Sequence, residues 1–304
     1  MKVLVTGAGG NLGRVVVPAL EEAGHKPRLF DFRPIEAQHE LVQGDIRSRN
    51  DVERAVEGVD AIVHAAALHG IHISKWEPDD YWAINVTGTF NLYEAARVAE
   101  IKKIVLCSTM GVYGESMTPP DDAWGLVTDT SPTRPGDIYG MSKWLCEHMS
   151  RYYSRRWGVQ TVALRLGMFV PETFEGYGFR LLFGGVDDRD VAQAVMLALG
   201  HEPQGGFDSF NIFADVPFSQ KDAHALNDNP EDVIEKYWPG SVQLFRDKGL
   251  NVRELIWSKL IWPPDKAKRV LGYRPRYNFT EFVEALRAGN TAHYPFANLP
   301  HWGV

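Results

Sequence analysis

The chain has few cysteines, no long apolar run and no excess of basic residues. Cys107 and Cys146 are too few for a disulfide framework and lack metal-like spacing, so no metal is expected. No run approaches a membrane span, and the first strand begins without a leader's apolar core. With 32 Lys and Arg against 39 Asp and Glu, the charge of −7 argues against nucleic acid or an anionic membrane as partner. These absences predict a cytoplasmic protein.

Short β-rich runs alternate with helical stretches through the first half of the chain. Strands are expected at residues 3–6, 28–31, 61–64, 103–108 and 161–166, and helices at 11–23, 79–100 and 137–157. Such alternation builds a parallel sheet with helices on both faces. We predict an α/β fold, with a Rossmann-type doubly wound sheet over residues 1–166. A smaller substrate-binding lobe should span 167–304, with segments around 187–213 returning to the sheet.

Three glycines follow the first strand and open the first helix. Gly7, Gly10 and Gly13 would let the backbone turn tightly and approach a pyrophosphate, and the helix starting near Asn11 would offer free N–H groups. Their spacing is three and three, whereas the standard dinucleotide fingerprint has two and three. A glycine-rich turn that binds nothing is the alternative.

An acidic residue ends the second strand. Asp31 lies where a carboxylate would accept the adenosine ribose hydroxyls, and its charge would repel a 2′-phosphate. NAD is therefore favoured over NADP. Arg33, two residues later, could instead attract that phosphate, although a solvated loop position is the simpler interpretation.

A tyrosine and a lysine share one face of the predicted helix 137–157. Tyr139 and Lys143 are four residues apart, and a nearby ammonium brings the phenol pKa down from about 10 toward the working range of a base. An exposed helix pair would have the same spacing. Ser108 and Thr109, however, follow a buried strand at the sheet edge where ligands collect, and a hydroxyl there can bond the reacting oxygen.

Together these motifs resemble the extended short-chain dehydrogenase/reductase family, the NAD-dependent epimerase/dehydratase group. The matching pieces are TGAGGNLG at residues 6–13, Asp31, GDI at 44–46, HAAA at 64–67, NVTGT at 85–89, STMGVYG at 108–114, YGMSK at 139–143, RLG at 165–167 and KAKRVLGYRP at 266–275. They cover nearly the whole chain in the family's order.

The resemblance implies roles for individual residues. Thr109 falls at the catalytic Ser or Thr, Tyr139 is the implied base, and Lys143 lowers its pKa and holds the nicotinamide ribose. The implied cofactor contacts are Gly7, Gly10, Asn11, Leu12, Gly13, Asp31, Asp45, Ile46, Ala65, Ala66, Ala67, Asn85, Ser108, Tyr139 and Lys143. Core packing is a competing role for the three alanines.

The short segment 167–186 resembles uronate dehydrogenases more than nucleotide-sugar epimerases, which usually carry a longer excursion there. Arg180 lies where those dehydrogenases bind the substrate carboxylate, although it could be a surface or ion-pair residue. This chain has Thr109 and Met110 at two positions where uronate dehydrogenases tend to have Asn and His. Its C-terminal part is also longer than theirs. Met110 would form an apolar wall near the reacting carbon.

Three functions are weighed for this chain. The leading one is an NAD-dependent oxidoreductase acting on a carbinol of a small carbohydrate, either a sugar or a sugar acid. The second is a sugar epimerase with no net redox change, and the third is a cofactor-binding scaffold without catalysis. The family often pairs helices such as 79–100 and 137–157 across a two-fold axis, so a homodimer is expected by resemblance.

Overall fold

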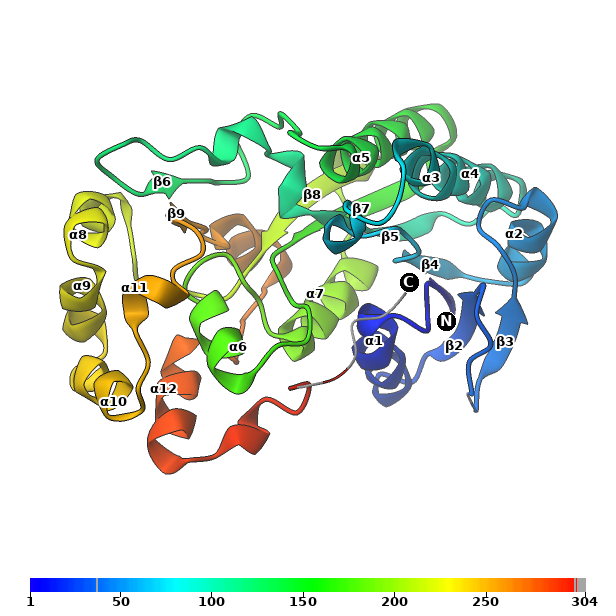
Figure 1. Cartoon of the computed structure of the whole chain (residues 1–304). Coiled ribbons are helices and arrows are strands. Elements are labelled where there is room, and N and C mark those ends of the chain that lie inside the picture. Colours follow the sequence, from blue (N-terminus) through cyan, green and yellow to red (C-terminus); the bar gives the residue numbers. More distant parts are fainter. Residues whose placement is uncertain (37, 298, 300–304) are drawn as a thin grey trace.

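A computed structural model describes residues 1–36, 38–297 and 299 of the chain, and a seven-stranded parallel sheet forms its centre (Figure 1). Its strands, in spatial order, are β3 (Glu40–Gln43), β2 (Lys26–Asp31), β1 (Lys2–Thr6), β4 (Ala61–His64), β5 (Lys103–Thr109), β7 (Gln160–Leu166) and β8 (Phe207–Ile212). Every neighbouring pair is parallel. The predicted doubly wound α/β sheet is confirmed, and each strand expected in the first half is present.

The strand order reverses between β1 and β4. The chain first builds β2 and β3 on one side of β1, and then returns to add β4 on the other side. Thr6 pairs with His64, so β1 and β4 end at the same level. Crevices at such reversal points, outside the carboxyl ends of the strands, are where open α/β sheets bind ligands.

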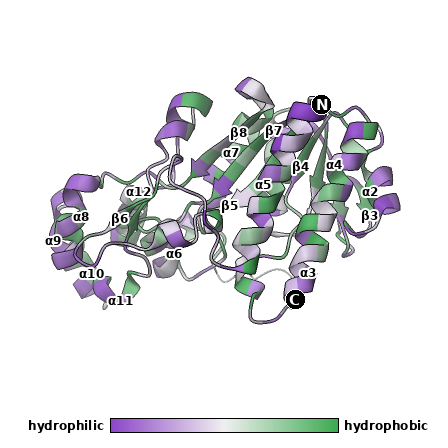
Figure 2. Ribbon diagram, turned by 90° about the horizontal axis from the view of Figure 1, so that it is seen from above, coloured by the Kyte–Doolittle hydropathy of each residue, from purple (hydrophilic) through white to green (hydrophobic). Residues whose placement is uncertain are grey.

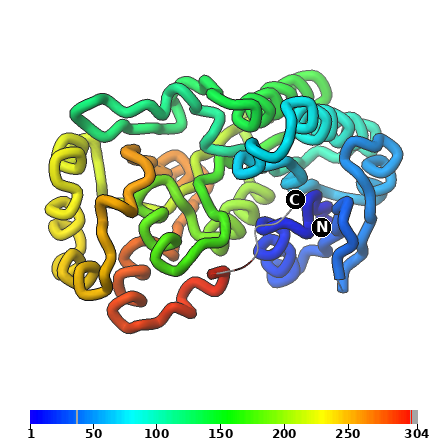
Figure 3. Tube along the Cα trace, in the orientation of Figure 1, coloured from blue at the N-terminus to red at the C-terminus, as the bar shows by residue number. Residues whose placement is uncertain are grey.

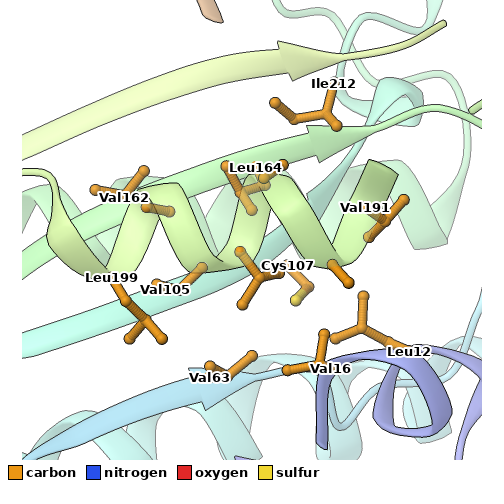
Figure 4. Packing of buried hydrophobic residues seen from close by; sticks show 14 of the residues in the cluster. Leu12, Val16, Val63, Val105, Cys107, Val162, Leu164, Val191, Leu199 and Ile212 are labelled. Atoms are coloured by element: carbon orange, nitrogen blue, oxygen red, sulfur yellow. The ribbon is translucent and has the colours of Figure 1, made fainter. Parts of the chain in front are cut away.

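Helices cover both faces of the sheet. They are α1 (Asn11–Glu22) and α7 (Asp188–Gly200) on one face, and α2 (Arg49–Val56), α4 (Gly88–Val98) and α5 (Ile138–Trp157) on the other. On the first face, Leu12 and Val16 of α1 and Val191 of α7 pack with Val63 and Val105 of the strands (Figure 4). Burial of this apolar layer fixes α1, and with it the glycine turn, against the sheet.

The predicted helix 79–100 is helical but not uniformly α. It begins as α3 (Pro78–Tyr81), widens into the π-helical segment η2 (Trp82–Thr87) and continues as α4. Such π-turns are rare in proteins and are frequently found at functional sites. Asn85 lies inside this segment and is 1% exposed.

A smaller lobe beside the sheet is built mainly from helices (Figure 3). They are α6 (Phe174–Arg180), α8 (Ala223–Asp228), α9 (Pro230–Tyr237), α10 (Ser241–Asp247), α11 (Val252–Leu255) and α12 (Phe279–Ala288). Its core is aromatic, with Phe179 and Phe245 against Phe279 and Phe282. The outer helices α8, α9 and α10 are largely hydrophilic (Figure 2).

Two long-range links join the lobe to the sheet domain. The short strands β6 (Gly125–Leu126) and β9 (Leu260–Ile261) pair in parallel, although they are far apart in sequence. The π-helical segment η7 (Ala267–Leu271) packs its Ala267 and Leu271 into the core beneath α7. Residues 241–261, between these links, hold α10, α11 and β9.

Candidate active site

The glycine turn between β1 and α1 has backbone geometry that excludes side chains. Gly7 has φ +68°, and a Cβ there would lie 2.8 Å from the backbone of Ala66. A Cβ on Gly13 would lie 1.9 Å from the Ala8 carbonyl oxygen, so this glycine lets α1 pack against the turn. Gly10 caps α1 without a side-chain hydrogen bond, which leaves the first N–H groups of the helix for a ligand.

A cavity opens over this turn at the carboxyl ends of β1, β2 and β4. The predicted cofactor residues that line it are Gly7, Gly10, Asn11, Leu12, Asp31, Asp45, Ile46, Ala65, Ala66 and Ala67. Further lining comes from positions that the sequence did not single out as cofactor contacts, among them Phe32, Arg47, His69, Trp76, Phe169 and Val170. The cavity thus extends from the end of β2 to the loop that follows β4.

Asp31 faces this cavity from the end of β2. One carboxylate oxygen accepts from the Gly9 N–H at 3.0 Å, and the other accepts from the backbone N–H and Nε of Arg33 at 3.0 and 3.2 Å. The oxygen that accepts only from Gly9 can accept a further hydrogen bond, as an adenosine ribose hydroxyl requires. The strained glycine, the uncapped helix and this acid together fit a dinucleotide, and the carboxylate disfavours one bearing a 2′-phosphate.

Tyr139, Lys143 and Thr109 come together beside the cavity. Asp137 caps α5 by accepting from the Gly140 N–H at 2.7 Å, which sets Tyr139 in the first turn. Lys143 follows one turn later and donates from Nζ to the Cys107 carbonyl at 2.9 Å. Thr109 ends β5, and its hydroxyl accepts from the Gly111 N–H at 3.1 Å. The helix α5 therefore positions Tyr139 and Lys143, and the strand β5 positions Thr109.

Burial controls the proton chemistry of this group. Burial raises the pKa of the Tyr139 phenol well above its usual value, and a hydrogen bond with Thr109 opposes that rise. Burial lowers the pKa of the Lys143 ammonium. A cation close to the phenol, which is the role predicted for Lys143, would stabilise the ionised form that a general base needs.

The loop after β4 packs directly on the tyrosine. The rings of His69 and Tyr139 lie 5.0 Å apart, and a Cβ on Gly70 would lie 3.0 Å from the Tyr139 ring. Asn85 holds the start of the loop by accepting from the Leu68 N–H at 2.8 Å and donating to its carbonyl at 3.1 Å. Asn85, predicted as a cofactor contact, therefore acts here as a support behind the cavity lining.

Ser108 was predicted to contact the cofactor, but its side chain does not line the cavity. It is 3% exposed, and its hydroxyl donates to Glu147 at 2.7 Å. Because side chains alternate along a strand, Ser108 and its neighbour Thr109 face opposite sides of the sheet. Met110 follows Thr109 and packs against a small apolar cluster that includes Trp262.

Arg180 lies behind the pocket wall, and this geometry does not support its predicted role in binding a substrate carboxylate. The side chain is fully buried, donates to Glu172 at 2.8 Å and lies 3.6 Å from Asp188. It also donates to the carbonyls of Val170 and Val186. Protein acceptors take both terminal nitrogens of the guanidinium, and only its buried Nε has no partner among the described residues, so Arg180 supports Val170, which lines the cavity.

A buried ion pair with one partner on the same helix as Tyr139 and Lys143 was not predicted from the sequence. Glu147 lies one turn beyond Lys143, and Arg165 of β7 donates to both of its carboxylate oxygens at 3.0 and 2.8 Å. Arg165 also donates to the Tyr113 hydroxyl at 2.9 Å. The spacing of Tyr139, Lys143 and Glu147 at successive helix turns is the signal that could have revealed it.

The fold and the site define a dinucleotide-binding α/β protein with a tyrosine placed to exchange a proton. Residues 3–178 match the NAD dependent epimerase/dehydratase family, and the chain belongs to that family. The predicted resemblance to extended short-chain dehydrogenases/reductases is thereby confirmed.

Named relatives include both dehydrogenases and epimerases. The chain is 31% identical to a uronate dehydrogenase of Pseudomonas syringae pv. tomato over 76% of its own length and 83% of that protein. It is 35% identical to a UDP-glucose 4-epimerase of Streptomyces lividans over 49% of its length and 46% of that protein. Its fold resembles a short-chain dehydrogenase/reductase superfamily protein from Agrobacterium tumefaciens with bound NAD, with a TM-score of 0.71, 23% identity, and coverage of 96% and 98% of the two chains.

Within the described residues, no helix has the length and apolar character needed to span a membrane. No group of three or more His, Cys, Asp or Glu side chains in the described ranges is arranged to hold a metal ion. The loop histidines His69 and His72 both line the cavity.

Proposed function

We propose that the chain is an NAD-dependent oxidoreductase that oxidises a carbinol of a sugar or sugar acid. The observation that carries this proposal is that Tyr139, hydrogen-bonded with Thr109 and one helix turn from Lys143, packs on His69 in the lining of a cavity suited to a dinucleotide. The likeness to a uronate dehydrogenase over most of both chains supports it further.

Each residue has one task in the proposed reaction. NAD, when bound, accepts the hydride that leaves the carbinol carbon. Tyr139 takes the hydroxyl proton, and the electron pair of that O–H bond becomes the second bond of the carbonyl. Thr109 hydrogen-bonds the reacting oxygen and orients it toward the phenol. Lys143 favours the phenolate through its charge, and its contact with the Cys107 carbonyl holds the ammonium against β5.

The substrate end of the cavity favours a small carbohydrate. Trp76 and Phe169 offer aromatic surfaces, while His69 and His72 offer polar groups. Such a mixture of aromatic walls and few polar groups is typical of small-molecule sites. Because Arg180 is paired with Glu172, a carboxylate on the substrate would have to bind through other groups. Neutral sugars are therefore candidate substrates alongside sugar acids.

A sugar epimerase is the second candidate, because the match to UDP-glucose 4-epimerases supports it. Both reactions use a tyrosine base and NAD, and they differ in whether the reduced cofactor accumulates. The dehydrogenase is preferred because the chain spans most of the uronate dehydrogenase but less than half of that epimerase.

The deciding experiment follows NADH absorbance after the protein is mixed with NAD and a panel of uronic acids, aldoses and nucleotide sugars. Accumulating NADH with one class supports the dehydrogenase. Absent NADH together with a changed sugar configuration by NMR would support the epimerase instead. Tyr139→Phe should lower turnover by about 100-fold or more, whereas Tyr277→Phe, which lies ahead of α12 in the lobe, should not.

We also propose a cytoplasmic homodimer. Exposed apolar side chains lie on η2, α4 and α5, namely Trp82, Phe90, Val98, Met141 and Tyr152. Apolar surface gathered on neighbouring helices is typical of an interface, and a second copy of the chain presents the same surface. The two buried free cysteines fit a reducing compartment. Sedimentation of the purified protein would test the dimer.

A further inference from the structure

A buried histidine joins the strand before the glycine turn to the π-helical segment. His64 ends β4, is 1% exposed and lies outside the lining of the cavity. Its Nδ1 lies 2.8 Å from the Thr6 hydroxyl, and its Nε2 lies 2.9 Å from the Thr89 hydroxyl. The imidazole therefore bridges β1, which leads into the turn, and α4, which continues from η2.

The direction of each hydrogen bond follows from counting donors and acceptors. The Thr6 hydroxyl oxygen accepts from the N–H groups of Ala65 and Ala66 at 3.2 and 3.1 Å, and the Ala65 N–H is shared with the Thr6 carbonyl oxygen at 3.3 Å. Both acceptor positions of the hydroxyl therefore face an N–H group. Its own proton must then point at Nδ1 of His64. An acceptor at Nδ1 places the ring proton on Nε2, and this N–H donates to Thr89.

The direction of the hydrogen bond between His64 Nε2 and Thr89 follows from the same kind of count. The Thr89 hydroxyl donates to the Asn85 carbonyl at 2.5 Å and accepts from the Cys146 thiol at 3.2 Å, which leaves its second acceptor position for His64. Burial, and after it the nearby charge of Lys143, lower the His64 pKa to about 3, which keeps the ring neutral. Each polar atom in this chain of bonds has one assigned direction, and a protonated ring would break the bond to Thr6.

Both ends of the bridge reach the site. At one end, the Ala65 and Ala66 amides held by Thr6 belong to the cavity wall. At the other end, the Asn85 side chain donates to the Ser142 hydroxyl at 2.8 Å, and Ser142 donates to the Tyr139 carbonyl at 2.7 Å. A shift of the imidazole would thus move the dinucleotide wall and the tyrosine base together.

We infer that His64 is a positioning residue, a neutral imidazole protonated at Nε2 that holds the cofactor wall and the helix turn of Tyr139 in fixed relation. The inference rests on the proposed NAD-dependent function. It assigns two separable effects, because Nδ1 serves the wall and Nε2 serves the tyrosine.

The first test is NMR of the full-length protein with ¹⁵N-labelled histidine, the His64 signals being identified by their loss in a His64→Gln variant. The inference predicts a proton on Nε2 and no titration between about pH 5 and pH 9. A proton on Nδ1, or a titration within that range, would overturn it. This measurement needs neither substrate nor turnover.

The second test separates the two bonds. An asparagine amide sits near the place of Nδ1 and a glutamine amide near that of Nε2, so each variant can keep one bond. His64→Asn should lower kcat roughly tenfold and leave NAD affinity nearly unchanged, and His64→Gln should weaken NAD binding roughly tenfold. His224→Gln, exposed on the lobe, is the matched control.

Folded variants with unchanged NAD affinity and unchanged kcat would overturn the inference, even if their stability fell. NAD affinity is read by titration without substrate. A wild-type protein that binds NAD but oxidises no sugar would refute the proposed function, while the NMR and NAD-binding results would still decide the role of His64.

Discussion

Removing one partner of the buried Glu147–Arg165 pair should destabilise the protein strongly. Glu147 and Arg165 have side chains only 1% and 4% exposed, and two hydrogen bonds of 3.0 and 2.8 Å join them. Breaking a buried pair on one side leaves an unpaired charge and costs about 3–5 kcal/mol. Glu147→Met would leave the guanidinium with the neutral Tyr113 hydroxyl and the Ser108 hydroxyl without its acceptor.

The double variant distinguishes pairing from packing. Replacing both charges by apolar side chains of similar length is often close to neutral, so Glu147→Met with Arg165→Met should recover most of the loss. We expect about 3–5 kcal/mol lost in Glu147→Met, a smaller loss in Arg165→Met because Arg151 still lies 3.7 Å from Glu147, and a coupling energy of at least about 2 kcal/mol between them. Urea unfolding followed by both tryptophan fluorescence and circular dichroism measures these values.

Additive losses in the two single variants would refute the reasoning, because they would show that the charges do not depend on each other. Single losses below about 1 kcal/mol would refute it as well, since that is the range of exposed pairs. Arg97→Met, which removes the partly exposed pair with Glu94, supplies that lower reference.

The same pair predicts how stability depends on pH. Burial alone would raise the Glu147 pKa, but the hydrogen bonds and charge of Arg165 outweigh it and hold the pKa below the ordinary 4.5. A carboxylate with a lowered folded pKa contributes stability that is complete above its unfolded pKa and lost as the pH falls through the folded pKa. Stability should therefore decline more steeply in acid for the wild type than for Glu147→Met.

Three further changes test the cofactor and proton sites. Gly7→Ala should weaken NAD binding at least about tenfold, because an alanine there must adopt a left-handed conformation and its Cβ would approach Ala66 closely. The control in the same titration is Gly24→Ala, where φ is +75° but the space around the Cβ is open. Asp31→Ala should lower the ratio of kcat/KM for NAD to that for NADP, and an unchanged ratio would contradict its role. Because burial raises the Tyr139 pKa, sugar oxidation should increase with pH through the alkaline range, and a rate independent of pH would exclude the phenolate as base.

The sequence predicted those parts of the site that depend on local spacing. Gly7 and Asp31 lie at fixed places relative to one strand each, and Tyr139 and Lys143 lie one helix turn apart. Parallel strands then bring their carboxyl ends together without further information. Such residues can be recognised because the element that carries them also sets their position.

Roles that depend on distant partners could not be predicted in the same way. Ser108 turns away because Glu147, on another element, accepts its hydroxyl. Arg180 is taken up by Glu172 and Asp188 on either side of its own short helix. The bridge through His64 needs hydroxyls from two elements, and no single-sequence pattern marks that coincidence.

The π-helical segment η2 has a consequence for changes in chain length. An α-helix turns by about 100° per residue, so the extra residue of a π-turn rotates everything after it by that angle. Because η2 precedes α4, this rotation turns α4 relative to Asn85. Asn85 can then face the loop and Ser142 while Leu92 and Ala96 of α4 face the sheet. Deleting any one residue of Trp82–Thr87 would permit an unbroken α-helix that satisfies only one of these faces. Substitutions at exposed positions of this helix leave its angular phase unchanged, whereas its residue count is fixed.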